Sequence, residues 1–160
     1  MWQSSLMKAV LPALLLLIVG CSKMEMASMK KQTDADAIRM VSRYQQAGTA
    51  EVETVLKDYL ALADHYERKG WAPYGAPGWI DELRSLCEAR LAVFYQAIGN
   101  SEAYRTHVYR AIQHRKRVYP DNIYTEEDVC GMVVRLDDAN IQPRWRNELS
   151  KPVPSDTLRP

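Results

Sequence analysis

Side chains with catalytic or metal-binding chemistry are few in this chain of 160 residues. Its histidines are His65, His107 and His114. His107 and His114 are spaced for one side of a helix, but no third ligand stands at a spacing that would complete a metal site. We find no Gly-x-Ser-x-Gly motif and no phosphate-binding loop. We therefore expect surface histidines, no catalytic residue, no metal and no enzyme activity, with a paired-carboxylate glycan hydrolase as a less favoured alternative.

Among the cysteines, Cys21 has the most informative surroundings. It follows Gly20 and an apolar run from Ala9 to Val19, which Lys8 precedes. This run is too short for a membrane-spanning helix, which needs about 20 apolar residues. Its length suits the apolar region of a secretory signal, with Lys8 as the positive charge and Gly20 as the small residue before the cleavage site. The alternative is an uncleaved signal anchor with a chance cysteine.

The sequence Leu17-Ile18-Val19-Gly20-Cys21 resembles the lipobox of bacterial lipoproteins. The resemblance implies transfer of diacylglycerol to the Cys21 sulfur, cleavage after Gly20 and acylation of the new amino terminus. Several acyl chains anchor a protein firmly, because each buried methylene contributes about 0.8 kcal/mol. Ser22 and Lys23 follow, where an aspartate would retain a Gram-negative lipoprotein on the inner membrane. The resemblance thus implies an outer-membrane protein facing the periplasm, with the lipid on Cys21 and no other cofactor.

The chain divides into four expected segments. Residues 1–20 are the signal peptide, and 21–33 are the lipidated N-terminus with a flexible tether, since 22–32 contain no aromatic or β-branched residue. One helical domain over 34–150 and a disordered, proline-containing tail over 151–160 follow. Without Lys8 the remaining chain has 20 basic and 20 acidic residues. Because its formal charge is zero, no nucleic-acid partner is expected.

Cys87 and Cys130 remain after the lipidated cysteine is set aside. An even number of cysteines in an oxidising compartment favours a disulfide. We therefore expect a structural Cys87–Cys130 bond, which would staple the domain. The alternative is two buried free thiols that behave as small hydrophobic residues.

Apolar residues recur at helical spacing through most of the domain, which predicts an all-α fold. The first helix covers 34–47, with Ile38, Val41 and Tyr44 on its apolar face. Gly48, Gly70 and Gly99 provide stops after the first three helices, and Pro120 follows the fourth. Thr125 and Asp128 resemble a capping box at the start of a short fifth helix. The expected helices are 34–47, 50–69, 78–98, 101–118 and about 125–136.

An internal echo groups these helices into two hairpins. The pattern Tyr44-Gln45-x-x-Gly48-x-x-Glu51 recurs as Tyr95-Gln96-x-x-Gly99-x-x-Glu102. The second hairpin also resembles a tetratricopeptide repeat, at Leu91, Ala92, Tyr95, Gly99 and Ala111, but it has Glu88 and Tyr104 where that motif has Trp and Ala. The offset of the echo also differs from the repeat length of that family, which is about 34 residues. We therefore expect a compact bundle of about five helices with similar hairpin packing.

Two features form the candidate binding surface. The first is the turn between the second and third helices, where Trp71, Tyr74 and Trp79 stand among glycines and prolines. Such rings can form a ligand platform or cap the core. The second is the helix over 101–118, where Arg105, Tyr109 and Arg110 point away from its apolar face. Cations near a helix end can also stabilise the helix dipole, and acidic residues of neighbouring helices can neutralise them.

These features favour a non-enzymatic interaction or assembly protein of the bacterial cell envelope. It would be bound to the membrane through its lipid and would hold an envelope protein as its partner. The alternative is a module that binds an anionic envelope polymer, peptidoglycan or lipopolysaccharide, through the basic helix and the aromatic turn.

Overall fold

The computed structural model describes residues 3–71 and 78–151, and the side chains from residue 25 onward. Within these ranges the chain is all-α and has no strand, as the sequence predicts. A π-helical turn, η1, leads directly into the fifth helix. The elements are α1 (Gln3–Gln46), α2 (Val52–Arg68), α3 (Trp79–Ala97), α4 (Ser101–Val118), η1 (Glu127–Gly131), α5 (Met132–Asn140) and α6 (Arg144–Leu149).

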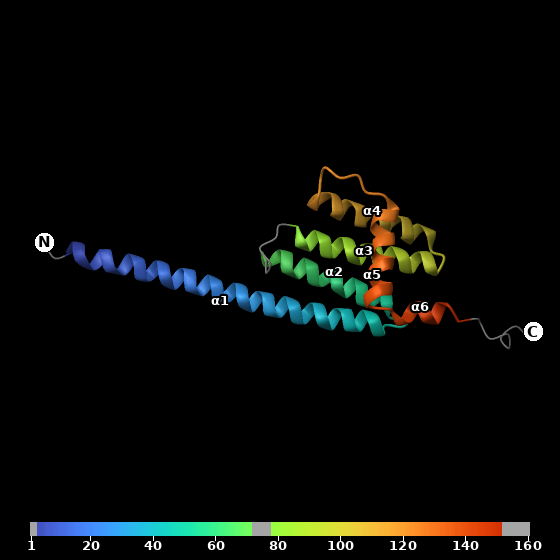
Figure 1. Ribbon diagram of the computed structural model, residues 1–160, viewed down its shortest axis with the longest axis horizontal. Helices are drawn as coiled ribbons and strands as arrows, with labels where there is room; N and C mark the ends of the chain where they lie inside the picture. The colour runs from blue at the N-terminus through green and yellow to red at the C-terminus, as the bar shows by residue number, and fades with distance from the viewer. Residues whose placement is uncertain (1–2, 72–77, 152–160) are drawn as a thin grey trace, which may run out of the picture.

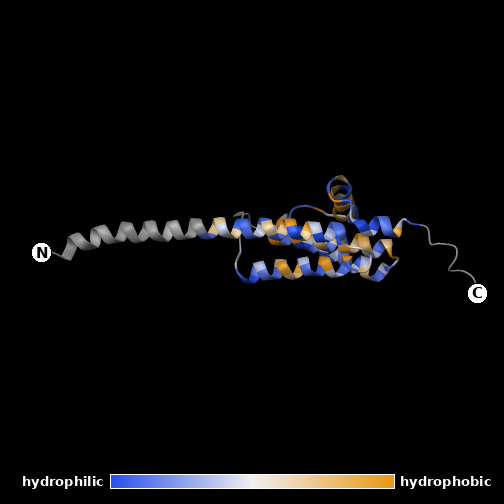
Figure 2. Cartoon of the chain, turned by 90° about the horizontal axis from the view of Figure 1, so that it is seen from below, coloured by the Kyte–Doolittle hydropathy of each residue, from blue (hydrophilic) through white to orange (hydrophobic). Residues whose placement is uncertain are grey.

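The first four helices lie side by side and alternate in direction, and α5 crosses them (Figure 1). The helix α3 is central, because it packs against α2, α4, η1 and α5. Hydrophilic and hydrophobic residues alternate along each of these helices (Figure 2), which gives each one a face to bury. The N-terminal half of α1 extends beyond the bundle.

The two predicted hairpins are present as α1–α2 and α3–α4. The echoed tyrosines, Tyr44 and Tyr95, are both buried in one core cluster. Each precedes the glycine of its junction, and Gly99 has a φ of +79°, a backbone conformation that glycine adopts without strain. The repeated pattern therefore marks equivalent positions where a helix turns back on itself.

The predicted capping box before the fifth helix is confirmed. The backbone N–H of Thr125 donates to Asp128 Oδ2 at 2.7 Å, and the N–H of Asp128 donates to Thr125 Oγ1 at 3.3 Å. The helix that follows is longer than expected, because α5 continues to Asn140. It carries Val133 into the core, whereas Leu136 is 40% exposed.

A buried ion pair ties the C-terminal part to the hairpins. Asp137 of α5 is fully buried and accepts from Arg90 Nη2 at 2.8 Å and from Arg90 Nε at 3.1 Å. Tyr44 Oη of α1 donates to the same carboxylate at 2.8 Å. Burial and the charge of Asp137 raise the pKa of Tyr44, so this hydroxyl keeps its proton. The network links α1, α3 and α5 through one side chain.

The helix α6 was not predicted, and it completes the core. Its Trp145 is buried and packs edge-on against Phe94 with the ring centroids 5.5 Å apart. Glu148 of α6 accepts from the backbone N–H of Thr49 at 2.8 Å, at the turn between α1 and α2. A single tryptophan in a six-residue helix offers no periodic pattern, which is why the sequence did not reveal it.

The expected apolar face of the first helix is wrong. Tyr44 is buried, but Ile38 is 73% and Val41 38% exposed, while Met40 and Asp36 face the core. The buried face of α1 contains polar residues that find partners inside the domain, and hydrophobicity alone therefore selected the wrong side. Residues 22–32 are helical in the structure, which differs from the expected flexible tether. They consist largely of Met, Lys, Ala and Glu, which are strong helix formers.

The expected Cys87–Cys130 disulfide is absent, and both cysteines are free and buried. Cys87 packs with Met40 and Tyr59, whereas Cys130 packs in another cluster with Ala89 and Ala92 of α3. At about 100° per residue these two alanines lie well away from Cys87 around the helix. The body of α3 therefore separates the two thiols.

Both thiols are expected to resist alkylation while the chain is folded. Burial raises the pKa of Cys87 to about 12 and that of Cys130 to about 11, so little thiolate forms at a mildly alkaline pH. Iodoacetamide should modify both residues only after denaturation, as peptide mapping by mass spectrometry would measure. A disulfide-linked peptide pair in the non-reduced protein would contradict this expectation.

None of the helices in the described part of the chain has a stretch that is both long and apolar enough to cross a membrane. Cys21 lies within α1, but its side chain is outside the described ones. The predicted disordered tail lies outside the described residues, apart from Lys151.

Candidate functional site: a groove between α1 and α3

Polar contacts fix the N-terminal part of α1 against the bundle. Tyr66 Oη of α2 donates to Asp36 Oδ2 at 2.7 Å, and Trp71 Nε1 donates to Thr33 Oγ1 at 3.0 Å. Burial raises the pKa of Asp36, but hydrogen bonds from Tyr66 and Gln32, together with the nearby Arg39 charge, lower it below its usual value overall. Asp36 is therefore ionised at neutral pH and can hold α1 in place.

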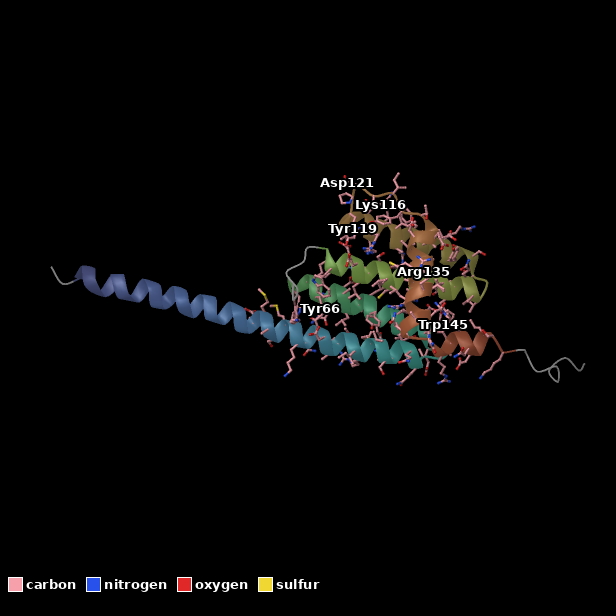
Figure 3. The ribbon with its side chains drawn as sticks, viewed as in Figure 1. Tyr66, Lys116, Tyr119, Asp121, Arg135 and Trp145 are labelled. Carbon is pink, nitrogen blue, oxygen red and sulfur yellow. The ribbon has the colours of Figure 1, made fainter. Side chains whose placement is uncertain are left out.

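The aromatic turn caps this contact. The Tyr66 ring lies 5.5 Å from the Trp71 ring, in a stacked arrangement, and 5.5 Å from the Trp79 ring, measured between centroids. Trp79 Nε1 donates to the Trp71 carbonyl at 3.3 Å. Figure 3 shows Tyr66 on α2, next to α1. Trp71 and Trp79 thus serve the fold, while Tyr74 lies outside the described residues.

A groove with a volume of about 300 Å³ opens beside this cluster. Helices α1 and α3 form its walls, and the Tyr59, Leu62 and Tyr66 side chains of α2 form its floor. Its polar lining residues are Thr33 and Glu82, and both already have hydrogen-bond partners. The groove therefore suits an apolar ligand or apolar side chains. The other lining residues are Ala37, Trp79, Leu83 and Leu86.

Exposed apolar side chains continue the α1 wall of the groove. Val41 follows Ala37 by one helical turn, and Ile38 lies about 100° further around the helix than Ala37. Ile38 is 73% exposed and Val41 is 38% exposed. A contiguous apolar surface of this kind is typical of a protein interaction site.

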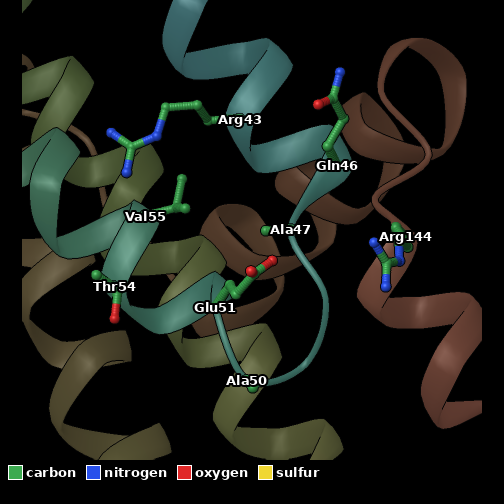
Figure 4. Close-up of a pocket in the computed structure, with 8 residues that line it drawn as sticks. All are labelled: Arg43, Gln46, Ala47, Ala50, Glu51, Thr54, Val55 and Arg144. Atoms are coloured by element: carbon green, nitrogen blue, oxygen red, sulfur yellow. The ribbon is translucent and has the colours of Figure 1, made fainter.

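A larger but polar pocket, of about 520 Å³, lies at the C-terminal end of α1, where the chain turns into α2 (Figure 4). Arg43 and Arg144 line it, but Arg43 pairs with Asp58 and Arg144 pairs with Glu148, each at 2.7 Å. Because both guanidinium groups are already paired, this pocket has no free cation to offer a ligand. It is therefore a weaker candidate than the groove.

The basic face predicted on α4 is exposed only in part of the helix. Arg105, Arg110 and Tyr109 are exposed, and Tyr109 is 64% accessible. Nearer the end of the helix, neighbouring carboxylates of α3 neutralise two of the cations. This is the alternative that the sequence left open for the basic face. These pairs are Arg115 with Glu82 at 3.5 Å and Arg117 with Asp81 at 3.3 Å.

The expectation that His107 and His114 lie on the surface is wrong. His107 is buried, and its Nδ1 lies 2.5 Å from Glu88 Oε2, while Tyr95 stacks on its ring. His114 Nδ1 lies 2.7 Å from Asp81 Oδ1 and is partly buried. Each pair joins α3 to α4, and the spacing of seven residues matches on both helices because they are antiparallel neighbours. The pairs therefore set the register of this hairpin.

No group of three or more His, Cys, Asp or Glu side chains is placed to hold a metal ion in the described part of the chain. Comparison of the chain with family models, with curated proteins and with solved structures found no match.

Proposed function

We propose that this chain is a lipid-anchored, non-enzymatic interaction protein of the bacterial cell envelope, which holds an apolar segment of a partner protein in the groove between α1 and α3. The observation that carries the proposal is the exposed apolar rim of Ile38 and Val41 beside an apolar groove. A helix that docks into a groove inserts apolar side chains at i, i+3 or i+4 and i+7, and its backbone stays paired internally. Such a segment would fill the groove and also cover Ile38.

The lipobox-like sequence supports an anchor at Cys21 and a location on the outer membrane, facing the periplasm. The helix α1 connects that cysteine directly to the groove wall at Ala37. A partner held there would stay next to the membrane. No cofactor other than the lipid is part of the proposal.

A photo-crosslinking amino acid at Ile38, in the anchored protein in its own cell, tests this function. We expect one envelope protein to be crosslinked reproducibly, and Val41→Asp to abolish the product because a carboxylate would be desolvated at the rim. Gln45→Asp, an exposed change one turn further along α1, should leave the product unchanged. The partner should lose its membrane location in cells that carry Val41→Asp.

One observation favours the polymer-binding alternative. Most of the described arginines form ion pairs, whereas Arg105 and Arg110 form none with described residues. If Ile38 captures nothing and the protein sediments with peptidoglycan in a salt-sensitive way that Arg105→Glu/Arg110→Glu removes, this alternative replaces the groove.

A further inference from the structure

One end of the bundle faces the direction in which α1 leaves toward Cys21 (Figure 1), and we call it the proximal end. It consists of the C-terminus of α2, the N-terminus of α3, and the C-terminus of α4, where the loop 119–125 begins. Tyr119 Oη donates to Glu82 of α3 at 2.6 Å, and Trp71, just after α2, bonds to Thr33 of α1. These contacts place the segments together in space.

Cations without an ion-pair partner among the described residues are concentrated at this end. They are all exposed, and they come from three helices: Lys30 and Lys31 of α1, Arg68 and Lys69 at the end of α2, and Lys116 of α4. The carboxylates at the start of α3 cannot neutralise them, because side chains of α4 and Tyr119 already occupy both.

Fewer negative charges are exposed around these cations. Glu25 and Asp34 are exposed on α1, and Asp121 is exposed in the loop after α4. Glu67 of α2 shares Arg84 with Asp64, at 2.6 Å and 2.5 Å, so these three side chains together carry one net negative charge. The proximal end consequently presents a surplus of positive charge.

An isolated apolar side chain stands in the loop that begins at this end, next to Tyr124, whose ring lies 5.9 Å from the guanidinium carbon of Arg115 in the last turn of α4. Ile123, in the loop after α4, is 91% exposed, and the nearby Tyr119 is 41% exposed. Figure 3 shows Lys116, Tyr119 and Asp121 close together at this end of α4. Basic side chains around exposed apolar and tyrosine side chains match the chemistry of a membrane surface, where phosphates lie above hydrocarbon.

We propose that the proximal end is a second membrane contact, in which Lys30, Lys31, Arg68 and Lys116 bind anionic phospholipid headgroups and Ile123 enters the interface. The inference rests on the proposed anchor at Cys21. Thr33 lies twelve positions after Cys21, which is about 18 Å of helix, so α1 must tilt to bring this end to the headgroups. The contact fixes the tilt of α1 and the direction in which the groove opens.

The test uses the lipidated chain reconstituted into liposomes, with an environment-sensitive fluorophore on Ile123→Cys. Cys87 and Cys130 are buried and Cys21 is blocked by its lipid, so labelling is selective. We expect a blue-shifted emission on liposomes containing phosphatidylglycerol. The shift should disappear at a salt concentration of about 1 M, where the screening length is about 3 Å. It should also disappear in Lys30→Glu/Lys31→Glu/Lys116→Glu, although the protein stays anchored.

The matched control carries the same label on Glu102→Cys, at the opposite end of α4, and should show no shift. An Ile123 label that behaves like the Glu102 label on anchored protein overturns the second contact alone. An equal shift on purely zwitterionic liposomes overturns the role of the cations. Failure of the chain to float with liposomes at all overturns the anchor, and with it this inference.

Discussion

Replacing Asp137 with asparagine should lower the free energy of unfolding by about 3–5 kcal/mol, because it leaves a buried cation without its counter-charge. Arg90, with a side chain that is 11% exposed, donates hydrogen bonds to this carboxylate from both Nε and Nη2. Burial lowers the pKa of Arg90, but its hydrogen bonds to Asp137 and the charge of that carboxylate outweigh burial and raise the pKa overall. The guanidinium therefore cannot escape the penalty by losing its proton. Urea denaturation monitored by circular dichroism would measure the loss.

Asp138 provides a matched control for this variant. It is the next residue, pairs with Arg146 at 2.5 Å, and is 63% exposed. Asp138→Asn should therefore cost no more than about 1 kcal/mol, the usual range for a surface ion pair. A second check is Arg90→Met in the Asp137→Asn background, which removes the orphaned charge. The double variant should recover part of the lost stability. If Asp137→Asn alone is as stable as Asp138→Asn, the buried ion pair contributes little.

The sequence predicted the hairpins but not the residue that connects them. Apolar spacing located α2, α3 and α4 closely, because each has a continuous buried face. Asp137 could not be found in this way, since a charged residue at a helical position normally marks the solvent side. Its burial depends on Arg90 and Tyr44, which are far away in the chain and are brought to it only by the complete fold.

The helix α1 shows the same limit of prediction from apolar spacing, here for apolar residues that turn out to be exposed. Its periodicity gave Ile38 and Val41 as core residues, yet the structure buries Thr33 and Asp36 because the aromatic side chains of Trp71 and Tyr66 satisfy them. The displaced apolar residues then become the rim of the candidate groove. The aromatic turn already pointed to this part of the bundle, whereas the contribution of α1 to the groove could not be read from hydrophobicity.

The disulfide was predicted from the even number of cysteines alone. That number says nothing about the distance between the two thiols or their orientation. Cys87 and Cys130 are both buried, but they occupy different clusters. Likewise, the histidines on α4 were isolated in the sequence, and only the antiparallel packing of α3 places Glu88 and Asp81 opposite them. A single sequence therefore predicts the helices, but it does not determine which side chains meet between them.

Trp145→Ala should lower the free energy of unfolding by about 3–5 kcal/mol, because removing a buried indole leaves a cavity that a short helix cannot refill. Trp145 is 1% exposed and packs against Phe94 in the cluster that also contains Tyr44 and Tyr95. Thermal and urea denaturation would measure the change, and hydrogen exchange should increase in α6 and around Thr49.

Two changes calibrate that result. Leu149→Ala lies in the same helix but at a position that is 40% exposed, so it should cost much less. Trp145→Phe keeps an aromatic ring against Phe94, and the indole Nε1 that it removes has no hydrogen-bond partner among the described residues, so its cost should fall between the other two. If Trp145→Ala instead lowers the free energy of unfolding no more than Leu149→Ala does, then α6 is not part of the core. The two hairpins with α5 would then form a stable unit without it.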